Sequence, residues 1–186
     1  GELNAYRYEN GRLVWQDQLS RTSIRTSVAS ISDIDASPVI DGGQVIAVGQ
    51  GGRMVAIDLL SGQRQWELNL AGISTPWVAG EWVFVVTDDS KLIAIARGNG
   101  KVKWITQLQR FVKESSKRGQ ISYSGPVLAG GRLFLTSTSG VSIAVDPLTG
   151  NVLGQTPIGK SVSLPPVVAN STLYILDDEA RLHAFR

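Results

Sequence analysis

The chain has 186 residues, of which 42 % are hydrophobic and 18 % are charged, with 20 glycines against 7 prolines. This balance excludes a disordered chain and a collagen-like chain, and it predicts a globular, turn-rich domain. The formal net charge of +2 gives no support for a general nucleic-acid-binding surface. Because the chain has no cysteine and one histidine, disulfides, thiol nucleophiles and histidine-cluster metal sites are excluded.

Three sequence markers recur along the chain in one register, which indicates internal repeats of about 40 residues. The first is a Gly-x-Leu-x-Ala-apolar pattern, with substitutes at some positions, whose alanines are Ala5, Ala56, Ala94, Ala144 and Ala184. The second is a proline before an apolar pair, at Pro38, Pro76, Pro126 and Pro166. The third is a glycine four residues before a tryptophan, at Gly11–Trp15, Gly62–Trp66 and Gly100–Trp104, with Gly150–Gly154 as a degenerate copy.

Each repeat is predicted to be a four-stranded antiparallel meander. In the second unit, residues 37–40, 44–48, 54–57 and 64–68 are rich in apolar or β-forming residues and are separated by glycine-containing turns. Units of this size are typical of β-propeller blades, in which the small alanines let neighbouring blades pack closely and the tryptophans fill the wider periphery. The expected order is the end of a blade at 1–19, blades at 34–70, 73–108 and 122–158, and an incomplete last blade at 162–186.

The repeats resemble the PQQ-type propeller repeat, as the segment from Gly52 to Trp66 illustrates. More narrowly, residues 31–40, 61–66 and 182–186 resemble the C-terminal half of the BamB family, which are lipoproteins of the outer-membrane β-barrel assembly machinery. The resemblance implies about half of an eight-bladed ring on the periplasmic side of the outer membrane, anchored by a lipidated N-terminal segment absent here. It also implies a non-catalytic interaction scaffold without a cofactor, docking on the POTRA repeats of BamA within the assembly complex. Unfolded outer-membrane proteins are a second implied partner.

Two insertions lengthen the spacing between repeats, and both are expected to be inter-blade loops. The first covers residues 20–35 and the second residues 109–118. Asp33 and Asp35 end the first insertion, and their spacing of two places both carboxylates on one side of a strand that begins there. Such a pair suits a basic partner, and the resemblance matches the two aspartates to the family surface that contacts BamA. The alternative is that they cap turn amides.

An enzyme hypothesis accompanies the scaffold hypothesis because PQQ-type repeats also build quinoprotein dehydrogenases. Against it, the chain has no cysteine pair and no Ser/His/Asp arrangement. The acidic runs 88–89 and 177–179 lack the spaced ligands of a calcium loop, so we interpret them as turn residues. His183 replaces an otherwise mostly apolar repeat position, which favours a packed or edge residue over a metal ligand.

The terminal units lead to two opposed expectations. If both lateral faces lack a neighbouring blade, the chain is expected to self-associate through those faces. If residues 1–19 instead pair with the three strands from Val162 onward, the chain closes as a four-bladed ring.

Overall fold

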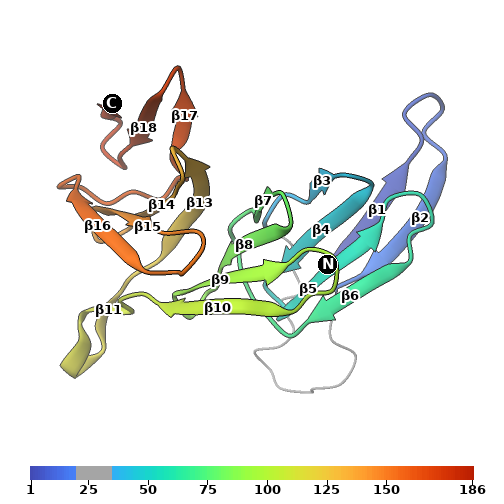
Figure 1. Ribbon diagram of the computed structural model, residues 1–186, viewed down its shortest axis with the longest axis horizontal. Helices are drawn as coiled ribbons and strands as arrows, with labels where there is room; N and C mark the ends of the chain where they lie inside the picture. Colours follow the sequence, from blue (N-terminus) through green and yellow to red (C-terminus); the bar gives the residue numbers. More distant parts are fainter. Residues whose placement is uncertain (20–34) are drawn as a thin grey trace.

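The computed structural model describes residues 1–19 and 35–186, which form antiparallel sheets joined by tight turns. The sheets follow one another along an open arc from the N-terminal hairpin to the C-terminal sheet (Figure 1). Three sheets have four strands each, in meander order. The predicted all-β fold of repeated blades is therefore confirmed. The complete blades are β3 (Val39–Asp41), β4 (Gln44–Gly49), β5 (Arg53–Asp58) and β6 (Arg64–Leu68); β7 (Trp77–Ala79), β8 (Trp82–Val86), β9 (Lys91–Ala96) and β10 (Val102–Gln107); and β13 (Tyr123–Ala129), β14 (Arg132–Ser137), β15 (Val141–Val145) and β16 (Val152–Pro157).

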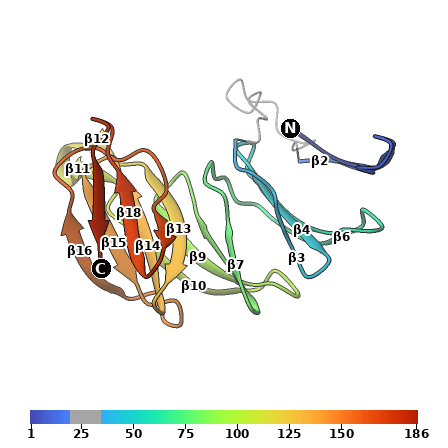
Figure 2. The same ribbon diagram turned by 90° about the horizontal axis from the view of Figure 1, so that it is seen from above.

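Smaller sheets lie at the two ends of the arc. Strands β1 (Glu2–Tyr6) and β2 (Leu13–Gln18) form a hairpin at one end, and β17 (Val167–Ala169), β18 (Thr172–Leu176) and β19 (Leu182–Phe185) form a three-stranded sheet at the other. In the view from above, the N-terminal hairpin lies far from the C-terminal sheet, which is seen in front of the blade β13–β16 (Figure 2). They do not pair with each other, so the described structure does not form the four-bladed closure. Self-association stays a prediction.

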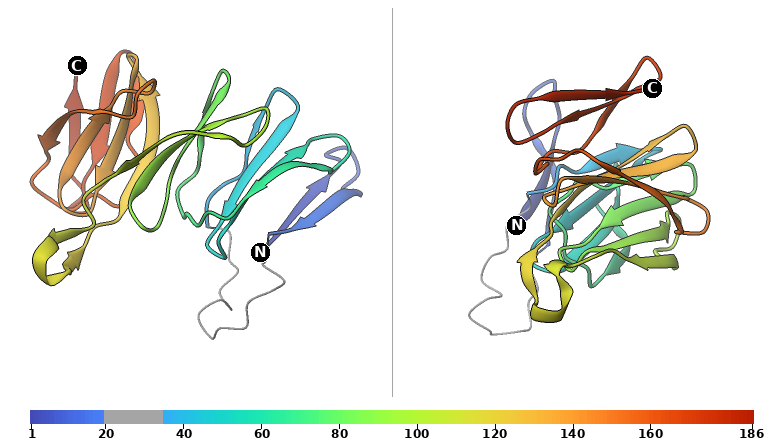
Figure 3. Two further views of the ribbon diagram at one scale, coloured as in Figure 1. Left: turned by 60° about the horizontal axis from the view of Figure 1, so that its bottom comes forward. Right: turned by 90° about the vertical axis from the view of Figure 1, so that its left-hand side faces the viewer.

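The second insertion, expected to be a loop, is a small hairpin instead. Strands β11 (Phe111–Lys113) and β12 (Arg118–Gln120) pair around the short 3₁₀ turn η1 (Glu114–Ser116). The Glu114 carboxylate accepts hydrogen bonds from the backbone N–H groups of Arg110 and Phe111, at 2.9 and 3.2 Å, and this fixes the entry to the hairpin. The hairpin projects from the blades (Figure 3). The loop expectation was wrong because these local bonds give a short polar segment its own pairing.

The aligned alanines lie on the third strand of each unit, as their repeat predicts. Ala5, Ala56 and Ala94 are cross-strand partners of Trp15, Trp66 and Trp104, and Ala144 is the partner of Gly154. A small side chain beside each indole leaves room for the ring to lie against the sheet. Trp66 and Trp104 in this way join the apolar packing between successive blades.

Each tryptophan also contacts the blade that follows its own. The indole Nε1–H groups of Trp15, Trp66 and Trp104 donate to the carbonyl oxygens of Leu59, Arg97 and Pro147, at 2.8, 2.6 and 3.1 Å. In each case the ring lies over a positive-φ glycine in the turn between the third and fourth strands of the next blade. The three tryptophan–glycine pairs are Trp15–Gly62, Trp66–Gly100 and Trp104–Gly150. These pairs set the spacing between successive blades.

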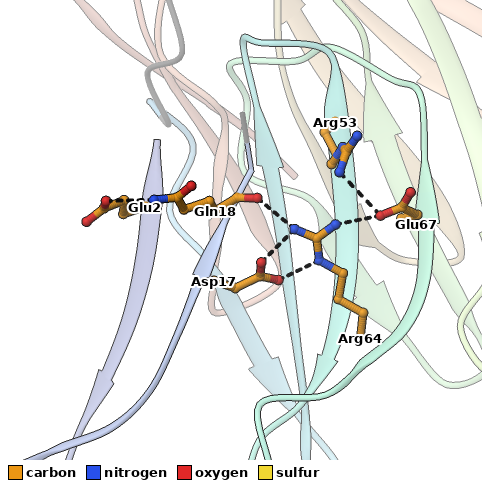
Figure 4. Close-up of polar contacts among 6 residues, drawn as sticks. All are labelled: Glu2, Asp17, Gln18, Arg53, Arg64 and Glu67. Carbon is orange, nitrogen blue, oxygen red and sulfur yellow. Dashed lines mark hydrogen bonds and ion pairs between the residues drawn. The ribbon is translucent and has the colours of Figure 1, made fainter. Parts of the chain in front are cut away.

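An ion-pair network ties the N-terminal hairpin to the first complete blade (Figure 4). The Arg64 guanidinium donates to both carboxylate oxygens of Asp17, at 2.7 and 2.6 Å, and to the Gln18 carbonyl oxygen at 2.6 Å. Its remaining Nη1 donates to Glu67 at 2.6 Å. The hydrogen bonds to Asp17 raise the pKa of Arg64 above its usual value, despite partial burial. The hairpin is therefore held by a bidentate contact as well as by apolar packing.

Candidate functional site

Asp35 is the predicted partner-binding residue that the described structure contains, since Asp33 lies outside the described residues. The Asp35 side chain is exposed, and the next residue, Ala36, is buried in the cluster shared by the blades β3–β6 and β7–β10. The backbone N–H of Ser37 donates to Thr75 Oγ1 at 3.2 Å. Asp35 is thus a solvent-facing carboxylate on a backbone that is anchored immediately after it.

Two further acids share the electrostatic surroundings of Asp35. Asp88 and Asp89 lie in the turn between β8 and β9. The pKa of Asp88 is raised, chiefly by burial and then by the negative charges of Asp89 and Asp35, while a hydrogen bond from the Ile73 backbone acts in the opposite direction. The charges of Asp35 and Asp88 therefore interact, and the two carboxylates form a local acidic patch.

Asp89 has its own cation within the turn. Its carboxylate pairs with Lys91 Nζ at 2.6 Å and accepts the Thr87 hydroxyl at 2.5 Å. Burial raises the pKa of Asp89, but the contacts with Lys91 and Thr87 outweigh burial and lower it overall. Asp89 therefore stays ionised and largely satisfied, whereas Asp35 forms no ion pair with another described residue. Asp88 is also exposed and forms no ion pair with another described residue, so Asp35 and Asp88 are the carboxylates here that are open to a partner.

A hollow of about 200 Å³ lies beside the acidic turn, lined by loops from three successive blades. Gln50 comes from the turn between β4 and β5, Asp88 and Ser90 from the next blade, and Ser122 from the segment entering β13. Tyr123 also lines the hollow, and its hydroxyl donates to the Gln109 carbonyl oxygen at 2.9 Å. Burial, and secondarily the charge of Glu114, raises the pKa of Tyr123 to about 12. The hollow offers amide, hydroxyl and carboxylate groups, which can hydrogen-bond a partner but supply no nucleophile with a base.

The other acidic run is engaged in turn structure, as its interpretation from sequence predicted. Asp177 accepts the backbone N–H groups of Glu179 and Arg181, at 3.0 and 2.9 Å, and its second oxygen lies 2.9 Å from His183 Nε2. Asp178 accepts hydrogen bonds from the hydroxyls of Ser161 and Ser163, at 2.5 and 2.9 Å. His183 is thus an edge-strand residue paired with a carboxylate. In the described ranges, 1–19 and 35–186, no three acidic, histidine or cysteine side chains converge on a possible metal position.

The projecting β11–β12 hairpin is basic, in contrast to the Asp35 end of the neighbouring blade. Arg110, Lys113, Lys117 and Arg118 surround the single acid Glu114, and all five are exposed. The sequence signal was the density of basic residues between 110 and 118, which identified an insertion but not a paired element. The structure therefore adds a cationic projection that sequence reasoning did not single out as a site.

Four-stranded meanders with a tryptophan–glycine contact between successive units place this chain in the class of PQQ-type β-propellers. A family model described as "Outer membrane protein assembly factor BamB" matches residues 1–106, more than half of the chain. The chain belongs to this family, as the sequence predicted.

Relatives of known sequence carry the same family name. The outer membrane protein assembly factor BamB of Yersinia pestis is 27 % identical over 186 residues, covering 100 % of this chain and 45 % of that protein. The BamB of Salmonella typhimurium is 26 % identical over 187 residues, covering 99 % of this chain and 45 % of its own length. This chain therefore spans less than half the length of these relatives.

Solved structures agree on the fold. The crystal structure of BamB from Moraxella catarrhalis superposes with a TM-score of 0.84 at 16 % identity, covering 99 % of this chain and 52 % of that one. A europium-containing methanol dehydrogenase superposes with a TM-score of 0.70 at 13 % identity, covering 99 % of this chain and 45 % of that one. At these identities the likeness extends to the blades and not to chemistry.

Proposed function

We propose that this chain is part of a non-catalytic interaction scaffold of the outer-membrane β-barrel assembly machinery, working on the periplasmic side of the outer membrane and anchored there by a lipidated segment. Membership of the BamB family supports this proposal, because the relatives are named as assembly factors. The scaffold docks on the POTRA repeats of BamA and assists the insertion of outer-membrane proteins. Unfolded outer-membrane proteins are its second class of partner.

The observation that carries the proposal is the exposed carboxylate of Asp35, which forms no ion pair with another described residue and interacts with the charge of the exposed Asp88. Asp33 and Asp35 together present two negative charges to basic residues of BamA. Connections into a first strand lie at the same end of a blade as the turns between second and third strands, because neighbouring strands run in opposite directions. The acidic turn at Asp88 therefore adds to the field that attracts a basic partner.

The test is charge reversal at both aspartates, D33K together with D35K, in the intact protein. Replacing attraction by repulsion at these two positions should weaken binding to the purified POTRA repeats by about tenfold or more and flatten its salt dependence. The matched control is E9K together with E81K, which makes the same change in net charge at exposed turns at the opposite end of the strands. Surface plasmon resonance at salt concentrations from about 50 to about 500 mM measures both affinities. Equal affinities for the two double variants would refute the docking site.

The alternative function is that of a fragment of a quinoprotein dehydrogenase. Structures of that class share the blades at 13–14 % identity. The residues around the 200 Å³ hollow are Ile73, Val86 and Ile121 together with amides, hydroxyls and one carboxylate. None of these lining residues specifically favours a dehydrogenase, so the scaffold is the function that we put forward.

A further inference from the structure

The projecting β11–β12 hairpin places two cations directly opposite each other. Lys113 and Arg118 are cross-strand partners, so their side chains leave the same face of the hairpin. Both are exposed, and neither forms an ion pair with another described residue. Like charges that face each other destabilise a pair of strands. The hairpin therefore carries an electrostatic cost that a bound anion would offset.

The rest of the hairpin adds to this positive charge. Residues 110–118 include four basic residues against one acidic residue, a net charge of +3. The Glu114 carboxylate accepts the backbone N–H groups of Arg110 and Phe111, at 2.9 and 3.2 Å, so it serves the local backbone and not the facing cations. The Arg110 guanidinium carbon lies 5.6 Å from the centre of the Phe111 ring. The cations beyond Glu114 are the part of the hairpin that is open to a partner.

The base of the hairpin is held by both neighbouring blades. The Tyr123 hydroxyl donates to the Gln109 carbonyl oxygen at 2.9 Å, and the Ile121 backbone N–H donates to the Arg110 carbonyl oxygen at 2.8 Å. From the preceding blade, the hydroxyl of Ser90 donates to the Ile121 carbonyl oxygen at 3.2 Å. The hairpin thus projects from an anchored base between two complete four-stranded blades, which lowers the entropic cost of binding to it.

The basic hairpin and the acidic patch border the same hollow. Gln120, the last residue of β12, lines the 200 Å³ hollow that Asp88 also lines. The charge of Asp88 in turn interacts with that of Asp35. A polypeptide segment that crosses the hollow can therefore bring basic groups to the two carboxylates and an acidic group to the hairpin.

A partner with charges of both signs fits this surface better than a uniformly anionic one. An anionic membrane would attract Lys113 and Arg118, but it would repel Asp35 and Asp88 beside the same hollow. A polypeptide can carry a carboxylate and cations within a short distance of each other. The combination of a basic and an acidic patch around one hollow therefore favours a protein partner.

We propose that the β11–β12 hairpin is a second docking element, which binds a carboxylate of the same polypeptide partner that presents basic residues to Asp35. The carboxylate lies between Lys113 and Arg118 and neutralises the two facing cations. This inference rests on the proposed function, since that function identifies the partner as the POTRA repeats of BamA.

The test measures binding of the intact protein to the purified POTRA repeats by isothermal titration calorimetry. K113E together with R118E replaces two facing cations by two facing anions, so the like-charge geometry is kept while attraction to a carboxylate becomes repulsion. Binding should weaken by about tenfold or more. The matched control is K101E together with R132E, which makes the same change in net charge at exposed positions at the opposite end of the same two blades. It should bind within about twofold of the unmodified protein.

A single substitution separates binding from folding. K113E alone places a carboxylate opposite Arg118, so the hairpin supplies its own anion. The midpoint of thermal unfolding should stay the same or rise, while binding weakens. Weaker binding together with a lowered midpoint would contradict the proposal, because the hairpin would then act through the stability of the fold.

The outcomes distinguish this contact from the one at the aspartates. Equal affinities for the hairpin double variant and its control would overturn the hairpin contact, whatever the result for D33K together with D35K. Weakened binding of the hairpin double variant with unchanged binding of D33K together with D35K would support the hairpin and refute the acidic docking site. A hairpin double variant that binds the POTRA repeats normally but no longer sediments with phosphatidylglycerol vesicles would overturn the proposal in favour of a membrane.

Discussion

Replacing Gly62 with alanine should destabilise the chain more than the same change at Gly43 of the same blade. Gly62 has a φ of +73°, a conformation that costs an L-residue about 1–2 kcal/mol. A Cβ there would lie 2.5 Å from Trp15 Cγ and 2.6 Å from Trp15 Cβ, so the indole must move. Overpacking of this kind costs about 1–3 kcal/mol, and weakening the 2.8 Å bond from Trp15 Nε1 to the Leu59 carbonyl costs up to about 1 kcal/mol more. The expected loss for G62A is about 2–6 kcal/mol.

Gly43 provides the matched control. It lies in the same blade with a φ of +77°, and a Cβ there would meet nothing within 4 Å. G43A should therefore cost only the conformational part, about 1–2 kcal/mol. Urea unfolding followed by circular dichroism gives both free energies. In a W15G background, which removes both the Cβ and the Cγ that a Cβ at position 62 would meet, the cost of G62A should fall to that of G43A. Equal losses for G62A and G43A in the unmodified background would refute the reasoning.

Two further variants test polar contacts. R64K removes the bidentate contact with Asp17, whose side chain is 13 % exposed, and should cost about 1–2 kcal/mol of unfolding free energy, whereas R181K at the exposed pair with Glu179 should change it by less than about 0.5 kcal/mol. D177N tests the pH dependence of stability. Hydrogen bonds from His183 and the Arg181 backbone lower the pKa of Asp177. The contribution of Asp177 to the stability of the fold is therefore complete above the usual aspartate pKa of about 4, and it is lost as pH falls through the lower folded-state pKa. The thermal midpoint of D177N should fall less steeply in acid than that of the unmodified chain, and parallel profiles would contradict this assignment.

The repeat register could be predicted from sequence because it depends on local pattern. The aligned alanines identify the third strands, since a small residue recurs where the sheet meets its neighbour. The contacts of the tryptophans could not be predicted in the same way. The sequence pairs Gly11 with Trp15 by their spacing, whereas in the structure Trp15 lies over Gly62 of the next blade. That contact depends on how two sheets stack, which no spacing within one repeat reveals.

The candidate site, too, could be predicted from the sequence only in part. The exposure of Asp35 follows from its place at the end of an insertion before a buried strand residue. Its interaction with Asp88 does not, because the two acids come from different blades and meet only when the loops converge. The β11–β12 hairpin was missed because its strands have three residues each and no apolar alternation. Its turn depends instead on Lys117 in the left-handed region at a φ of +50° and on the bonds to Glu114.

A scaffold requires both fixed blades and exposed groups that remain unsatisfied, and this chain places the two in different parts of each unit. The indoles satisfy their N–H groups across the blade interfaces and fix the spacing between sheets. The loops at the Asp35 end are then held in constant relation, so a partner meets a preorganised surface at a lower entropic cost.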